Sequence, residues 1–87
     1  MLKITHMTNA GTTTLIVSGR IDAEQLPELR RSVETQQASD VVIDLNEVSL
    51  VNVEVVRFLV HCERQGIRLA DCPAYVREWM TREQRPP

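Results

Sequence analysis

The chain has 87 residues, carries a formal net charge of -2 and is only 3% aromatic. This length suits a single domain whose core is near the lower size limit for folding unaided. Acidic and basic residues are mixed along the chain, which argues against nucleic acid as a main partner, because nucleic-acid binders usually carry a basic patch. The mixture does not favour a membrane surface either, and the few aromatic residues argue against a stacking platform for bases or sugars.

The sequence carries no signal for export or for crossing a membrane. Its longest uninterrupted apolar runs, such as LIV and FLV, are far shorter than a bilayer-spanning segment. The first residues, MLKITHMTNAG, lack the basic-then-apolar layout of a signal peptide. Two cysteines in a chain without an export signal indicate reduced thiols. We therefore expect a cytoplasmic protein.

The first two segments predict a β-hairpin. Residues 2–7 (LKITHM) alternate weakly between apolar and polar side chains, which indicates a strand. Residues 8–11 (TNAG) predict a turn, because Asn and Gly accept positive φ angles. Residues 12–18 (TTTLIVS) are rich in β-branched side chains and predict the second strand, which Gly19 is expected to end.

A helix is expected next. Asp22 is a good N-cap, and Gln25 completes the spacing of a capping box. Pro27 leaves the start open between a tight first turn after Asp22 and a later start near Gln25. The apolar stripe that should face the core is Leu26, Leu29 and Val33. Residues 36–40 (QQASD) read as a polar connection.

Residues 41–45 (VVIDL) predict a buried strand, in which Asp44 either faces the opposite side of the sheet or caps the following loop. A loop is expected from Asn46, and Asn52 then caps a helix over residues 53–65. The alternating valines of residues 51–55 would also suit a strand. Helix is favoured by a C-terminal Gly66 and by one polar face, formed by Glu54, Arg57, His61 and Arg64.

Residues 67–71 (IRLAD) predict a last strand, and Cys72 with Pro73 opens a last helix whose Val76, Trp79 and Met80 should pack inward. Residues 81–87 (TREQRPP) are expected to form a polar, disordered tail after a single domain of residues 1–80. The order is β-β-α-β-α-β-α. It predicts an α/β fold with a four-stranded mixed sheet and helices mainly on one face.

In open α/β sheets, sites form beyond the carboxyl ends of the strands, which directs attention to the loop Asn46 to Val53. This loop is not the only candidate. Cys72 at a helix N-terminus would have a lowered thiol pKa and be reactive, or it would simply be a small, partly buried capping residue. A Cys62–Cys72 disulfide is disfavoured, because Cys62 should lie roughly 13 Å from the start of its helix, whereas Cys72 should lie level with that start.

Motifs of an enzyme or a metalloprotein are missing from the sequence. His6 and His61 have no Cys, Asp or Glu at ligand spacing, so we expect no metal site. There is no Ser/His/Asp order, no P-loop and no glycine-rich dinucleotide turn. We therefore expect a protein that is not an enzyme and needs no cofactor.

Three local motifs occur in this order of elements: residues 19–22 (GRID), residues 42–45 with 48–51 (VIDL and VSLV), and residues 66–69 (GIRL). Together they resemble the STAS domain, the fold of bacterial anti-sigma factor antagonists and of the cytoplasmic tails of sulfate transporters. The resemblance covers residues 2–80. It implies a module that binds a protein partner, such as an anti-sigma factor or a switch kinase.

The chain departs from this family where the family's switch lies. Antagonists of the family carry Asp-Ser, a small or polar residue and Gly before the second helix, and a kinase phosphorylates the Ser. Residues 52–55 here are NVEV, so the hydroxyl position falls on Val53, which accepts no phosphate. Asn52 has lost the acidic charge, and Val55 replaces the glycine. The family also continues with another strand and helix after the third helix.

The leading hypothesis is therefore a non-catalytic interaction module of bacterial signalling or transcription regulation that is not phosphorylated at the usual position. One alternative is a homodimer that covers a sheet edge or apolar surface left by the shortened C-terminus. A remote alternative is a thiol redox sensor that uses Cys72. The expected partner-binding residues are Asn46, Glu47, Ser49, Asn52, Val53, Glu54 and Arg57.

Overall fold

A computed structural model describes residues 2–35 and 40–84. Residues 36–39 of the predicted connection and the last three residues of the predicted tail lie outside these ranges. The described residues form an α/β fold in the expected order β-β-α-β-α-β-α. One mixed sheet has the strand order β1-β2-β3-β4, in which only the β1–β2 pair is antiparallel. The predicted fold class is confirmed.

The hairpin pairs β1 (Lys3–Asn9) with β2 (Thr12–Ile21) through a two-residue turn. Ala10 and Gly11 both have positive φ angles, 50° and 83°, as a type I′ turn requires. This turn twists in the sense that suits the flanking strands, so the first strand continues to Asn9. The predicted turn was thus two residues too long at its start.

Gly19 was expected to end the second strand, and this prediction is wrong. β2 continues to Ile21, with Gly19 at φ 94° inside the strand. The pairing with β3 shifts register twice, between Ile16 and Ser18 and between Gly19 and Arg20. A β-bulge accommodates the unusual conformation of the glycine without ending the ladder.

The longest strand, β3 (Asp40–Val51), replaces the expected loop after residue 45. Its second half pairs in parallel with the end of β2, where Ser18 lies beside Glu47 and Ile21 beside Val51. β3 carries one extra residue at each register shift. Each extra residue breaks the apolar alternation, so Leu45 and Val48 are both buried although they are three residues apart. The interrupted pattern looks like a loop in the sequence.

The first helix, α1 (Leu26–Glu34), has Gln25 at its N-cap, so the later of the two predicted starts is correct. The capping-box groups form a turn before the helix: the Asp22 N–H donates to the Gln25 side chain at 3.2 Å. Pro27 is the second helical residue, where a backbone N–H has no partner within the helix. The proline therefore fits the helix start.

The second helix, α2 (Val53–Arg64), begins at the predicted residue and ends one residue before the predicted Gln65, which is its C-cap. At its C-terminus Gly66 has a φ of 91°, and the Ile67 N–H donates to the Cys62 carbonyl at 3.0 Å. The Gly66 N–H donates to the Glu63 carbonyl at 3.0 Å, which completes a Schellman motif. The predicted polar face of the helix is exposed: Glu54, Arg57, His61 and Arg64.

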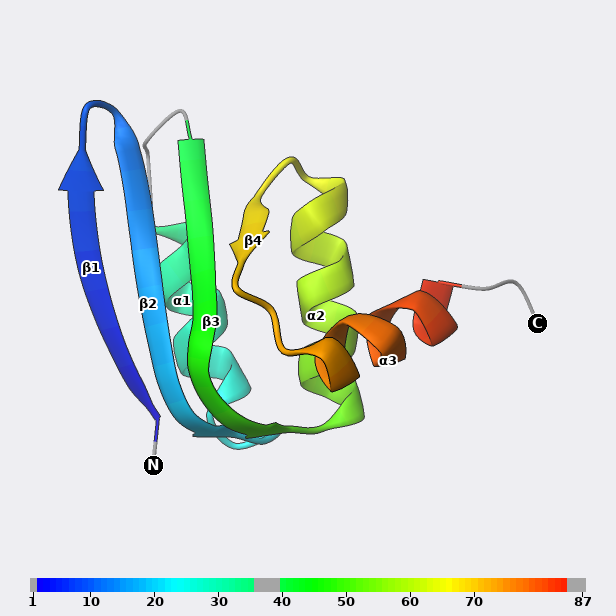
Figure 1. The fold of residues 1–87 in the computed structure, drawn as a ribbon. Helices are drawn as coiled ribbons and strands as arrows, with labels where there is room; N and C mark the ends of the chain where they lie inside the picture. Colours follow the sequence, from blue (N-terminus) through cyan, green and yellow to red (C-terminus); the bar gives the residue numbers. More distant parts are fainter. Residues whose placement is uncertain (1, 36–39, 85–87) are drawn as a thin grey trace.

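β4 is short (Arg68–Ala70), and α3 (Ala74–Gln84) follows it. α3 lies beyond β4 and against α2 (Figure 1). The helix was expected to end near Met80, and this is wrong. The last turn is held because the Arg57 Nε donates to Glu83 at 2.8 Å and the Gln84 amide donates to the Met80 carbonyl at 3.3 Å.

The core lies between one face of the sheet and the helices. Thr13, Leu15 and Val17 are buried on β2, whereas the residues that alternate with them are only half-buried. α1 lies behind β2 and β3 in Figure 1, and no helix formed by residues 2–35 and 40–84 covers the near face of the sheet. The arrangement agrees with helices mainly on one face. The side chains with no exposed surface at all are Leu15, Val17, Ile21, Leu29, Ile43, Val55, Val56, Leu59, Val76 and Met80.

The hairpin turn gives a first prediction. Ala10→Asn should raise the free energy of unfolding by about 0.5–1 kcal/mol, because Asn takes the left-handed conformation more readily than Ala. Urea denaturation followed by circular dichroism measures the change. Ala10→Val is the opposite control and should lower stability, since a β-branched residue tolerates positive φ poorly. Equal midpoints for the two variants would contradict the type I′ turn.

Candidate functional site

The residues expected to bind a partner lie on two surfaces. Asn46, Glu47 and Ser49 are exposed on the second half of β3 and lead to the start of α2. Glu54 and Arg57 are exposed on α2 and border a groove between α2 and α1. The predicted contact segment is thus the second half of a strand and a helix start, and its geometry is fixed by the pairing of β3 with β2.

Asn52 and Val53 form the start of α2. The Asn52 side chain accepts a hydrogen bond from the Val55 N–H at 3.0 Å, so the predicted N-cap is confirmed. Val53 is half-buried. This exposure is intermediate between that of an exposed contact residue and that of a residue folded under the chain. Neither side chain offers a nucleophile or a phosphate acceptor.

Asp44 lies on the sheet face opposite the core, since it alternates with the buried Ile43 and Leu45. Its carboxylate accepts the Asn46 N–H at 2.9 Å. The Asn46 amide in turn donates to Glu47 at 3.4 Å. These local hydrogen bonds occupy the polar groups at the first bulge of β3 and give them a structural role.

Two exposed apolar residues next to this segment were missed by the sequence analysis. Leu50 is 54% exposed on β3 and Tyr75 is 45% exposed in the first turn of α3. The Tyr75 hydroxyl donates to the Ser49 carbonyl at 3.0 Å, which places Tyr75 beside the residue that precedes Leu50, near the carboxyl end of β3. We call this pair the Leu50–Tyr75 patch. The sequence offered one indication that Tyr75 matters, which is that it is one of few aromatic residues in the chain.

The groove between α1 and α2 has a volume of about 500 Å³. Leu26 and Phe58 lie at its base, but each is only 7% exposed. The Arg30 guanidinium lies over the Phe58 ring, 5.6 Å from its centroid. Both acidic and basic side chains line the groove, so it offers no single sign of charge. Its charged rim residues include Arg30, Glu34, Glu54 and Arg57.

Both cysteines are free thiols. Burial raises the pKa of Cys72; Arg77 partly offsets this, and Glu63 raises the pKa further. Burial also raises the pKa of Cys62, to about 11, against a smaller opposing effect of Arg30. The expectation of a lowered pKa at Cys72 is therefore wrong. The helix begins at Ala74, and desolvation of the thiol outweighs the neighbouring positive charge.

Within residues 2–35 and 40–84, no group of three or more His, Cys, Asp and Glu side chains is arranged to hold a metal ion. In the same part of the chain no helix is long and apolar enough to cross a membrane. No protein-family model matches the chain, and no curated protein matches it.

The Asn52 cap gives a second prediction. Asn52→Ala should lower the free energy of unfolding by about 1 kcal/mol, because the Val55 N–H loses its partner. Asn52→Ser should retain most of the stability, since serine also accepts from a helix N-terminus. Thermal denaturation compares the variants. Asn46→Ala is the matched control from an exposed site and should change stability less than Asn52→Ala does.

The thiol pKa gives a third prediction. A raised pKa means less thiolate near neutral pH, so iodoacetamide should alkylate Cys72 several-fold more slowly in the folded protein than in urea. The rate in the folded protein should keep rising above pH 9, where an ordinary thiol is already mostly ionised. Mass spectrometry measures the rates, with Cys72→Ser reporting the contribution of Cys62. Faster alkylation in the folded state would contradict this interpretation.

Proposed function

We propose that this protein is a non-catalytic, cytoplasmic interaction module of bacterial signalling or transcription regulation. Its partner, by the resemblance to STAS domains, is an anti-sigma factor or a switch kinase. Two features support the proposal. The order of strands and helices agrees with that resemblance, and the motif segments at residues 19–22, 42–51 and 66–69 fall on or beside the strands.

The observation that carries the proposal is the Leu50–Tyr75 patch. Two large side chains stay about half exposed there, at 54% and 45%, in a domain that has little apolar material to spare. Partially exposed aromatic and aliphatic residues on a rigid frame are typical anchors of protein interfaces. The patch lies where the parallel strand β3 ends, which is the usual place for a site in an α/β sheet.

The rim of the proposed interface is polar. Glu47 and Ser49 are exposed on β3, and Glu54 and Arg57 are exposed on α2. Arg57 is also bonded to Glu83 of α3, so its position is tied to the helix that carries Tyr75. An apolar centre with a charged rim is the common arrangement of protein interfaces.

Phosphorylation at the usual family position cannot switch this interface, because Val53 has no hydroxyl. Binding is then constitutive or is controlled through the partner. The half-buried Val53 lies between Asn52 and the exposed face of α2, where it contributes shape and no charge.

Binding to a purified anti-sigma factor or switch kinase, encoded beside this protein, gives the fourth prediction. Calorimetry should show binding by the native chain, and Leu50→Glu or Tyr75→Ala should weaken it at least about tenfold, which corresponds to about 1.4 kcal/mol. Gln65→Glu is the matched control, since Gln65 is exposed at the C-terminal end of α2, away from the patch and from β1. It should bind like the native chain.

Two results would count against the proposal. One is a failure of every neighbouring signalling protein to bind the native chain. The other is an equal loss of binding for Gln65→Glu and Leu50→Glu. In the same experiment with the kinase and ATP, the intact mass should stay unchanged. A phosphate increment on Ser49 would overturn the statement that binding is not gated by phosphorylation of this segment.

A further inference from the structure

β1 is an open edge of the sheet. It lies at one end of the strand order, and no other segment of residues 2–35 and 40–84 pairs with its outer side. Figure 1 shows β1 at the margin of the sheet, far from α2 and α3. All of its seven residues are exposed except Ile4, which is half-buried.

The hairpin geometry fixes which backbone groups point outward. In a two-residue hairpin the residues that flank the turn, here Asn9 and Thr12, exchange both of their N–H···O bonds. Hydrogen-bonded and non-hydrogen-bonded pairs then alternate along the strands. The N–H and C=O groups of Ile4, His6 and Thr8 therefore face away from β2 and are available to another strand.

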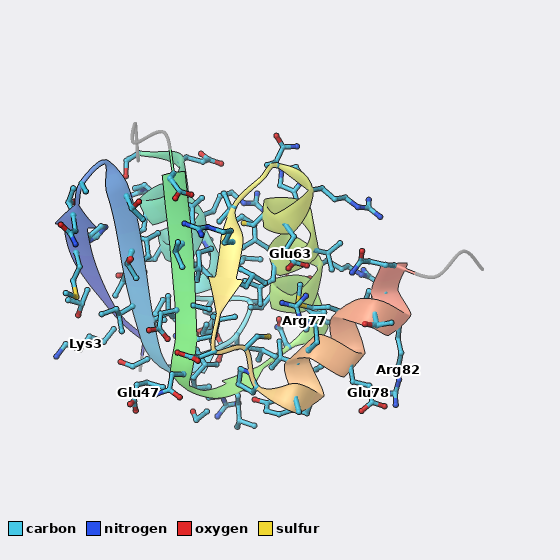
Figure 2. All side chains as sticks on the ribbon, turned by 45° about the horizontal axis from the view of Figure 1, so that its top comes forward. Lys3, Glu47, Glu63, Arg77, Glu78 and Arg82 are labelled. Atoms are coloured by element: carbon cyan, nitrogen blue, oxygen red, sulfur yellow. The ribbon has the colours of Figure 1, made fainter. Side chains whose placement is uncertain are left out.

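β1 lacks the features that normally protect an edge strand. It contains no proline, its register with β2 is continuous without a bulge, and its one permanent charge, Lys3, lies at its first residue. Figure 2 shows Lys3 extending outward at that end of the strand. The opposite edge, β4, has only three residues and begins with Arg68, so it offers a much shorter template.

We propose that the edge of β1 binds the same edge of a second copy of this chain, antiparallel and with the two-fold axis at His6. His6 then pairs with His6 of the second copy, and Ile4 pairs with Thr8 of the second copy. Each of these pairs exchanges both N–H···O bonds, since these are the residues whose groups face outward. The two four-stranded sheets merge into one continuous sheet.

The side chains of β1 suit this register. Thr5 lies opposite Met7 of the second copy, so the dimer covers the largest exposed apolar side chain of the strand. Lys3 lies opposite Asn9 of the second copy, and the two Lys3 side chains are at opposite ends of the ribbon. No two permanent charges of like sign face each other across the axis. One pair of short strands buries little area, so the dimer belongs to the weak, reversible class.

This surface shares no residue with the Leu50–Tyr75 patch, so the dimer does not depend on the proposed function. It also differs from the self-association expected from the sequence, which was assigned to an edge or surface at the C-terminal side. The structure places the longer open edge at β1, because β4 is short and α3 follows it.

The first test is sedimentation and light scattering over a concentration series that extends to about 1 mM, the range of weak complexes. The native chain should shift from monomer toward dimer as its concentration rises. His6→Lys should remain monomeric, because it places two permanent charges opposite each other at the axis. His6→Thr is the matched control and should dimerise like the native chain. A native chain that stays monomeric throughout, or His6→Lys dimerising like His6→Thr, would overturn the proposal.

The second test checks the register by oxidative cross-linking in a Cys72→Ser background. His6→Cys should form a disulfide-linked dimer, because a hydrogen-bonded antiparallel pair has Cα atoms about 5.5 Å apart, within disulfide range. Thr8→Cys should not, because the two copies of that residue would lie about 13 Å apart along the ribbon. Circular dichroism checks that both variants fold. Two results would overturn the register. One is that Thr8→Cys cross-links as fast as His6→Cys, and the other is that neither variant cross-links.

Discussion

The parallel ladder between β2 and β3 is the interaction on which the rest of this structure depends. It runs from the Thr12–Asp40 pair to the Ile21–Val51 pair, along the full length of both strands. Its buried side chains form the apolar surface against which α1 and α2 pack. The ladder also fixes where β3 ends, and therefore where Asn52 starts α2. A change in this register would move the core and the proposed contact surface together.

The third helix packs against α2, and the hydrogen bond from the Tyr75 hydroxyl to the Ser49 carbonyl ties it to β3. Both contacts determine the position of Tyr75 in the Leu50–Tyr75 patch. Val76 and Met80 are fully buried and provide the apolar part of the contact. The Arg77 guanidinium donates to both carboxylate oxygens of Glu63 at 2.9 and 3.0 Å, and Figure 2 shows the two side chains directed toward each other. These contacts place the first turn of α3 beside the end of β3. Tyr75 is then held by the Ser49 carbonyl and cannot fold into the core.

The sequence predicts the order of elements and the ends of α2 well, because these depend on local chemistry. Asn52 and Gly66 act through hydrogen bonds and backbone conformation within a few residues. The length of β3 could not be predicted, since its two bulges interrupt the alternation on which a strand prediction relies. The exposure of Leu50 follows from the second bulge, after which Leu50 pairs with the exposed Arg20. The last turn of α3 depends in part on an ion pair between Glu83 and Arg57, which are far apart in the sequence.

The two proposed surfaces have a joint consequence. At the start of α2, the Asn52 side chain already accepts the Val55 N–H, and Val53 has no reactive group. Function there has to come from shape and apolar contact and not from covalent chemistry. A single patch of two anchors supports only modest affinity. A two-fold dimer through β1 would present two copies of the patch in a fixed relation. A dimeric partner could then bind both copies at once, and the second contact would form at a high effective concentration. Weak self-association would in this way strengthen recognition without any added contact at the patch itself.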